Sequence, residues 1–183
     1  EITKEQIETT WGVHPARIIP FNELYQGLLD NVKARNIIRI IDDNLEIFNY
    51  TAHEQYNANW NKFTLIARGL ILDVKKQFVI ATPFPKFFNY GEAKIWSADE
   101  VSGQIVVARK YDGSLGIVFF DGNRWRVATR GAFNSEAATW AQQWLDQNID
   151  IRLLEIGNTY LFEIIYLGNR IVVPYYFQGM VLL

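Results

Sequence analysis

Short apolar segments separated by turn residues make up most of this chain, and they constrain its fold more than any other feature. Turn-forming triplets such as Asp42-Asp43-Asn44 and Asp121-Gly122-Asn123 stand between stretches rich in β-branched and aromatic residues. Strands joined by tight turns pair with their neighbours in an antiparallel sense. The expected strands are 37–41, 45–50, 64–73, 77–82, 104–110, 115–120, 124–130, 159–166, 170–176 and 178–183.

Helical spacing of apolar residues interrupts this pattern in a few places. The clearest expected helix is 136–147, which Asn134 or Ser135 would cap and whose Trp140 and Trp144 are expected in the core. Residues 51–61 are polar and rich in turn formers. The other expected helices are 3–10, 22–35 with Asn22 as its cap, and a short one within 149–156. The sequence therefore predicts one α+β domain with antiparallel sheets and flanking helices.

Composition limits the chemistry. The chain has 183 residues, a net charge of −2 and no cysteine, so disulfides, thiolate nucleophiles and cysteine-bound zinc are excluded. Its two histidines, His14 and His53, are too few for a histidine-rich metal site, so any metal must be held by oxygen atoms. No membrane span or signal-like segment is evident, and we expect a soluble, cytoplasmic, monomeric protein. The acidic balance does not favour nucleic-acid binding, although a local basic groove remains compatible with it.

Residues 110–114 read Lys-Tyr-Asp-Gly-Ser and stand between the apolar stretches 105–108 and 116–120. The Asp-Gly pair favours a turn, so Lys110 is expected where one strand ends and the next begins. A free lysine amine has a pKa of about 10.4, and attack on a phosphorus or carbonyl centre requires a site that lowers it. Desolvation or a neighbouring cation does this. The pattern indicates a nucleophile; an ordinary strand-end lysine is the alternative.

The same five residues resemble motif I of the covalent nucleotidyltransferases, the superfamily of ATP-dependent DNA ligases, RNA ligases and mRNA-capping enzymes. Further blocks, in the same order, resemble the RNA ligase 1 family of the T-even phages. The likeness is good over residues 45–183 and weak before them. The blocks are Arg-Gly-Leu-Ile at 68–71, Pro-Phe-Pro-Lys-Phe-Phe-Asn at 83–89, Thr-Arg-Gly at 129–131, Phe-Glu-Ile-Ile at 162–165 and Asn-Arg-Ile-Val at 169–172.

The resemblance implies a nucleotidyltransferase domain, the ATP-grasp-like adenylation domain of ligases. Its core would be residues 45–183, with residues 1–44 as a helical scaffold leading into it. Lys110 would attack the α-phosphate of ATP and form a lysyl-AMP. The AMP would pass to an RNA 5′-phosphate, and a 3′-hydroxyl would then displace it and seal the strand, as in the repair of nicked tRNA.

Fixed cations must surround a phosphoryl-transfer transition state, because negative charge gathers on its oxygens. Arg68, Lys86 and Arg130 are the candidates, and Arg130 stands where the resembled family has a lysine. Arg68 follows an apolar stretch expected to be a strand, and a structural salt bridge is its alternative role. Lys86 lies in a proline-stiffened segment beside aromatic residues.

Carboxylates complete the expected site. Glu163 lies within an apolar strand, where an unpaired charge is costly, so it needs a partner. The resemblance implies contact with the ribose hydroxyls or with a hydrated Mg²⁺, and a core salt bridge is the alternative. Asp112 either forms the turn or orients water on the same Mg²⁺. For the adenine, the resemblance implies a cleft near Tyr50, and Phe88 and Ile165 are further candidates.

Two other functions remain open at this stage. A DNA ligase or capping enzyme would use the same lysine, but the 83–89 and 169–172 blocks disfavour it. The other alternative is a nucleotide-binding or interaction module without complete catalysis. It is supported by the absence of a Glu-Gly and a Lys-x-Lys motif, which the resembled family has after Glu163. The chain accordingly reads as a domain truncated before its C-terminal motifs.

Overall fold

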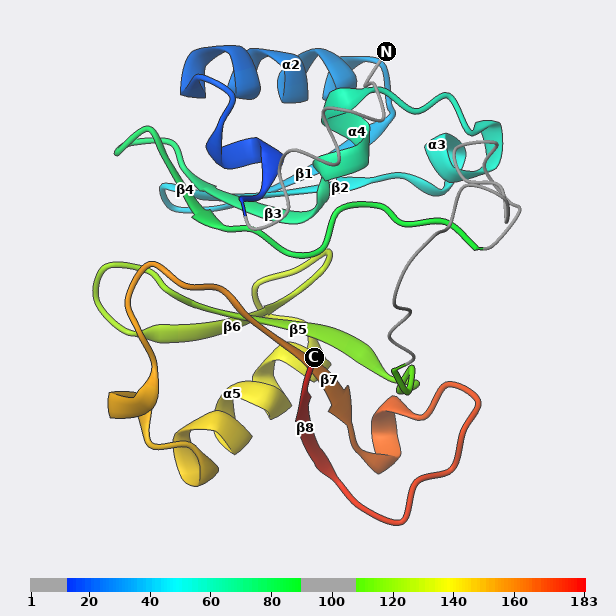
Figure 1. Cartoon of the computed structure of the whole chain (residues 1–183), viewed down its shortest axis with the longest axis vertical. Coiled ribbons are helices and arrows are strands. Elements are labelled where there is room, and N and C mark those ends of the chain that lie inside the picture. Colours follow the sequence, from blue (N-terminus) through cyan, green and yellow to red (C-terminus); the bar gives the residue numbers. More distant parts are fainter. Residues whose placement is uncertain (1–12, 90–107) are drawn as a thin grey trace, which may run out of the picture.

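Two antiparallel sheets face one another in the computed structural model, which describes residues 13–89 and 108–183 (Figure 1). The first sheet has the order β1-β2-β3-β4 and the second the order β6-β5-β7-β8. The strands are β1 (Ile37–Asp42), β2 (Leu45–Tyr50), β3 (Arg68–Asp73), β4 (Phe78–Ala81), β5 (Ser114–Phe120), β6 (Trp125–Thr129), β7 (Tyr160–Ile165) and β8 (Gly179–Leu182). The α+β prediction with antiparallel sheets is confirmed.

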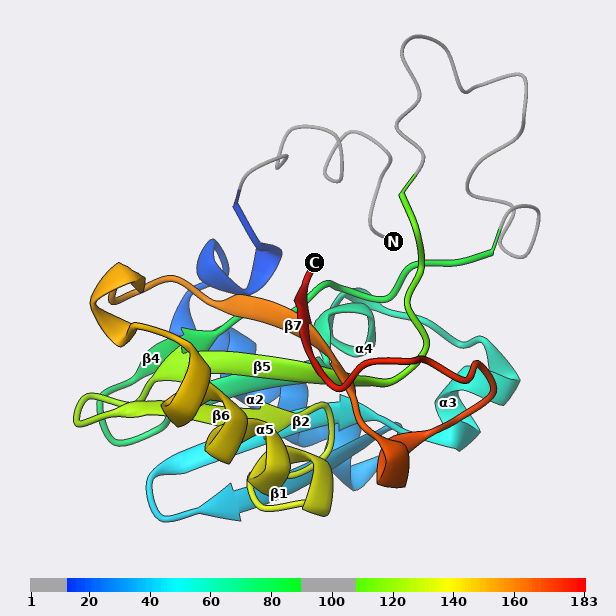
Figure 2. The same ribbon diagram turned by 90° about the horizontal axis from the view of Figure 1, so that it is seen from below.

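Helices cover the outer faces of the two sheets (Figures 1 and 2). The helices α2 and α4 pack on the first sheet and α5 on the second, which gives four layers. No helix within the described ranges is long and apolar enough to cross a membrane. The helical segments are η1 (Pro15–Arg17), α2 (Phe21–Lys33), α3 (Ala52–Asn57), α4 (Lys62–Ile66), α5 (Glu136–Asn148), η3 (Ile151–Leu153) and η4 (Leu167–Asn169).

Each strand sends alternate side chains to the two faces of its sheet, and this period of two builds the core. In β5, Ile117 and Phe119 point between the sheets, whereas Val118 points toward α5. In β7, Leu161 lies between the sheets, so Glu163 follows on the same face, two residues further along. The cluster between the sheets is formed by Leu45, Ile47, Ile71, Ile80, Ala81, Ile117, Phe119, Ala128, Phe133 and Leu161.

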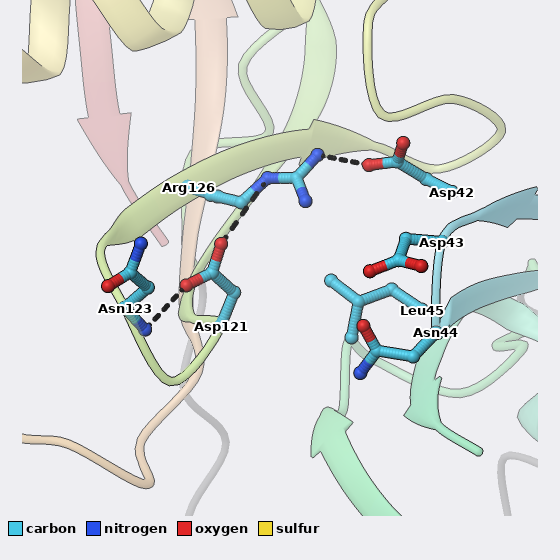
Figure 3. Close-up of a pocket in the computed structure, with 7 residues that line it drawn as sticks. All are labelled: Asp42, Asp43, Asn44, Leu45, Asp121, Asn123 and Arg126. Atoms are coloured by element: carbon cyan, nitrogen blue, oxygen red, sulfur yellow. Dashed lines mark hydrogen bonds and ion pairs between the residues drawn. The ribbon is translucent and has the colours of Figure 1, made fainter. Parts of the chain in front are cut away.

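An ion-paired arginine joins the two sheets at one end (Figure 3). Arg126 in β6 binds Asp42 at the end of β1 with an N–O distance of 2.6 Å, and its Nε lies 3.9 Å from Asp121 in the β5–β6 turn. Only 19% of the Arg126 side chain is exposed, so it is not a solvated strand-edge residue. Arg126 is therefore a structural link between the two sheets.

Several local predictions are wrong. The expected strand 64–73 begins only at Arg68, because Asn61 and Thr64 form a capping box that starts α4. The polar stretch 51–61 contains α3, which Thr51 caps. Helix α2 begins after Pro20, so Asn22 is not its cap.

The C-terminal third departs from the prediction in two places. Residues 170–176 form a loop instead of a strand, and of the expected helix in 149–156 only η3 is present. The predicted cap Ser135 and the partly buried Trp140 and Trp144 on α5 are confirmed. The expected helix 3–10 and residues 104–107 of an expected strand lie outside the described residues.

Candidate functional site

The predicted site residues lie at the opposite end of the two sheets from Arg126. Tyr50 ends β2, Arg68 begins β3, and Arg130 directly follows β6. Glu163 lies near the end of β7, and residues 110–113 lead into β5. Because neighbouring strands are antiparallel, the end of one strand and the beginning of the next meet at the same edge. Residues that are distant in sequence therefore share one edge of the molecule.

Gly69 allows the two sheets to approach closely at this edge. It has a φ of +90°, and a Cβ at this position would lie 2.7 Å from Ile117 Cδ1 and 3.1 Å from Arg130 Cα. The arginine reaches back to the first sheet: Nη1 of Arg130 donates to Tyr50 Oη at 3.5 Å, and its Cζ lies 5.4 Å from the ring centre. Arg130 and Tyr50 thus connect the sheets across the candidate site.

Arg68 adds a second guanidinium. Its Nη1 donates to the Phe84 carbonyl at 3.4 Å, and its Cζ lies 4.8 Å from the centre of the Phe87 ring. Burial lowers the pKa of Arg68, and the charge of Arg130 acts in the same direction. Tyr50 and Glu163 oppose that shift. Two partly buried guanidinium groups close enough to repel each other form a place where an anion is stabilised.

Glu163 is half-buried at the centre of this group. Burial raises the pKa of its carboxyl, and the backbone N–H of Gly113 and the charges of Lys110 and Arg68 lower it. The charge of Asp112 acts with burial to raise it. The cations whose charges act on Glu163, Lys110 and Arg68, are predicted site residues.

Lys110 lies on the surface in a segment without regular secondary structure. The expected position at the end of a strand is not observed in residues 108–110, and β5 begins only at Ser114. Gly113, in the second half of the motif, holds the motif close to β7. A Cβ on Gly113 would lie 2.3 Å from the Ile164 carbonyl oxygen, so only glycine allows the chain to pass this close to β7.

The turn residue Asp112 has a clear structural role. Its Oδ2 accepts hydrogen bonds from the backbone N–H groups of Val172 and Val173, both at 2.8 Å. These bonds hold the pKa of the Asp112 carboxyl below its usual range. Its own N–H donates to Tyr175 Oη at 2.8 Å. Asp112 thus anchors loop 170–176 beside Lys110, while the predicted role in orienting metal-bound water stays a prediction.

A group of aromatic residues surrounds Lys86. Its Nζ donates to the Phe87 carbonyl at 2.8 Å and lies 4.4 Å from the Phe88 ring centre and 5.5 Å from that of Trp60. Trp60 also packs edge-on against Tyr50, with ring centres 5.1 Å apart. Trp60 was not predicted as a site residue because it stands in a polar stretch, although a tryptophan among turn residues is itself an unusual feature.

Not every candidate joins this group. Ile165 is buried and lines a shallow cleft with Asp112 and Tyr175, whereas the Phe88 ring packs against Trp60 beside Lys86. No described contact joins Phe88 and Ile165, so they do not line one adenine cleft as expected. Within residues 13–89 and 108–183, no three histidine or acidic side chains are grouped as for a metal ion, so an ion here would rely on one or two carboxylates and water.

Comparison with known proteins places this chain in a family. The family model described as RNA ligase, of the T4 RNA ligase 1 type, matches residues 66–182, which include Arg68, Lys110, Arg130 and Glu163. A protein of Thermovibrio ammonificans named "Putative RNA ligase" is 30% identical over 121 residues, covering 63% of this chain and 32% of that protein. The chain spans about a third of the length of this curated relative. The chain belongs to the RNA ligase family of the T4 RNA ligase 1 type.

Proposed function

We propose that this chain is the adenylyltransferase domain of an ATP-dependent RNA ligase, with Lys110 as its nucleophile. The lysine Nζ, after losing a proton, attacks the α-phosphorus of ATP. A P–N bond forms, the bond from that phosphorus to the bridging oxygen breaks, and pyrophosphate leaves. The AMP then passes to the 5′-phosphate of an RNA, and a 3′-hydroxyl displaces it as the strand is sealed.

The observation that carries this proposal is the convergence of Lys110, Glu163 and Arg68 at one edge, although their sequence positions lie far apart. Arg68 and Arg130 supply fixed positive charge for the phosphate oxygens, whose charge grows in the transition state. Lys86, beside the rings of Trp60 and Phe88, supplies further positive charge for the phosphates. Trp60 and Phe88, which are only partly buried and pack beside the buried Tyr50, supply the apolar surface for the adenine.

Glu163 and Asp112 suit a magnesium site. Their charges interact, and Mg²⁺ is commonly held by one or two carboxylates with several waters kept in place. An ion held there would neutralise phosphate charge during the reaction. The charge of Lys110 also acts on Glu163, so the carboxylate lies near the proposed nucleophile.

We extend the proposal to the protein's setting: a monomer in the cytoplasm that repairs cleaved RNA, with residues 45–183 as the catalytic core. The substrate would be RNA with 5′-phosphate and 3′-hydroxyl ends. The match to the RNA ligase family supports RNA over DNA.

A chase experiment tests the function. The chain is incubated with ATP labelled at the α-phosphate and Mg²⁺, freed of nucleotide, and then mixed with a 5′-phosphorylated RNA oligonucleotide. We expect label to move from the protein to the RNA 5′ end, and little transfer to 5′-hydroxyl RNA or to DNA of the same sequence. Equal transfer to DNA would contradict an RNA ligase, and a chain that binds ATP without taking up label would be a non-catalytic module.

A further inference from the structure

A row of aromatic side chains lies beside Lys110 in the second sheet's half of the molecule. The ring centres of Tyr111 and Tyr175 are 6.0 Å apart, and those of Tyr175 and Phe177 are 5.5 Å apart. The guanidinium carbon of Arg109 lies 4.9 Å from the Tyr111 ring centre and 6.0 Å from that of Tyr175. We refer to Tyr111, Tyr175, Phe177 and Arg109 as the aromatic row.

The aromatic row is not part of the hydrophobic core. None of its rings belongs to the three buried clusters, and 45% of Phe177 is exposed. Tyr175 and Phe177 border a shallow cleft. The cleft's other lining residues are Asp112, Ile165, Tyr166, Leu167, Asn169, Arg170, Val173 and Pro174. Exposed apolar side chains gathered beside the proposed nucleophile, such as Phe177, Val172 and Val173, are typical of a binding site.

Hydrogen bonds connect the row to the segment that carries Lys110. Tyr175 Oη accepts the N–H of Asp112, which lies two residues after the lysine. The Asp112 carboxylate in turn accepts the N–H groups of Val172 and Val173, at the start of the segment that carries Tyr175 and Phe177. A surface ordered before its ligand arrives loses less conformational entropy on binding.

We propose that the aromatic row is a stacking platform for the bases of a single-stranded RNA end that is presented to Lys110. This proposal rests on the proposed function. Bases stack on aromatic faces whatever their sequence, which suits an enzyme that must accept different RNA ends. Arg109 and Arg170 lie beside the rings and are exposed, so they complement the phosphates between those bases.

The adenine of ATP is the less suitable occupant. A separate aromatic group, Tyr50 with Trp60 and Phe88, adjoins Arg130 and Lys86, whose cations match a triphosphate. Tyr175 and Phe177 of the aromatic row lie on the loop that follows β7, and Tyr111 and Arg109 flank Lys110 before β5. ATP and the RNA end therefore have separate aromatic surfaces.

Equilibrium binding tests the platform. The probe is a short single-stranded RNA with a 5′-phosphate and the fluorescent base 2-aminopurine, whose emission falls when it stacks. For Phe177→Leu and for Tyr175→Leu we expect the Kd to rise roughly tenfold. Tyr175→Phe keeps the ring and loses only the hydrogen bond to Asp112, so its Kd should rise less than that of Tyr175→Leu. The matched control is Tyr56→Leu, since Tyr56 is 90% exposed on α3, and it should leave the Kd unchanged.

A second probe separates bases from phosphates. An oligonucleotide of equal length and charge without bases should bind the wild type roughly tenfold more weakly than the RNA, and Phe177→Leu should not weaken it further. Unchanged RNA affinity in both leucine variants would overturn the platform. Equal loss of affinity for the probe without bases would also overturn it, since stacking would then not be the cause.

Failure of the proposed function is distinguishable from failure of the platform. Labelling of the wild-type chain by ATP in the absence of RNA depends on Lys110 and needs no RNA surface. A labelled chain whose leucine variants bind RNA normally loses only the platform, whereas a chain that never takes up label loses the proposed function.

Discussion

Ser114 Oγ donates a hydrogen bond to Asn169 Oδ1 at 2.8 Å, and this contact joins the motif that contains Lys110 to the block that follows β7. Asn169 also donates through Nδ2 to the Ile164 carbonyl at 2.8 Å. One side chain therefore fixes both the start of β5 and the end of β7. These are the elements that bring Lys110 toward Glu163.

A double-mutant cycle measures this contact. Ser114→Ala and Asn169→Ala should each lower the free energy of unfolding by about 1 kcal/mol. The loss should be larger for Asn169→Ala, because this variant also loses the hydrogen bond to the Ile164 carbonyl. The double variant should cost less than the sum of the two, since the shared bond is lost only once. Urea denaturation gives the values; strictly additive losses would contradict a direct bond.

Gly113→Ala tests the close passage of the lysine motif along β7. The added Cβ would lie 2.3 Å from the Ile164 carbonyl oxygen, so the backbone must shift and stability should fall by about 1–3 kcal/mol. Gly131→Ala is the matched control, because nothing lies within 4 Å of a Cβ there. Thermal denaturation of both variants decides the point, and equal melting temperatures would refute the close contact.

Arg130→Ala should slow the formation of lysyl-AMP by about 10²–10³-fold if its guanidinium stabilises the phosphate charge. Arg130→Lys should retain part of the rate, since it keeps the charge but loses the fork of donors. Single-turnover labelling with ATP measures both, with the exposed Arg124→Ala as control. A normal rate in a folded Arg130→Ala variant would restrict this residue to linking the sheets through Tyr50.

Glu163→Gln separates chemistry from stability. Burial raises the pKa of Glu163, so the folded state binds its proton more tightly than the unfolded state does. Its contribution to stability is therefore present at low pH and is lost as the pH rises from the ordinary glutamate range through the raised pKa. We expect the variant to be at least as stable as wild type at neutral pH while its lysyl-AMP formation slows. Normal labelling would assign Glu163 a structural role.

His14 predicts the opposite pH dependence. Burial and the charge of Arg17 lower the pKa of His14 from 6.5 to about 4, so the unfolded state binds the proton more readily. Stability is then complete above pH 6.5 and falls as the pH decreases toward 4, by on the order of 3 kcal/mol. His14→Asn keeps an acceptor for the Ala16 N–H and should flatten this loss. Denaturation of the wild type and of His14→Asn at several pH values tests this. A loss of stability at low pH that is equal in both proteins would contradict a role for His14.

The extent to which sequence predicts this molecule differs between regions. Alternation correctly predicted β5 and β6, because strands joined by a tight turn need only local information. The segment 170–176 is as apolar as a strand, but the N–H groups of Val172 and Val173 donate to a side chain 60 residues away. Such a partner is set by tertiary structure, and so is the convergence of Arg68 on Glu163. The family blocks identified those residues, whereas their contacts came from the fold.

Intact-mass spectrometry of the chain after incubation with ATP and Mg²⁺, followed by peptide mapping, tests the central claim most directly. The account predicts one added AMP, located on Lys110, that is absent from Lys110→Arg. An adduct on another residue, or undiminished labelling of the Lys110→Arg variant, would contradict it.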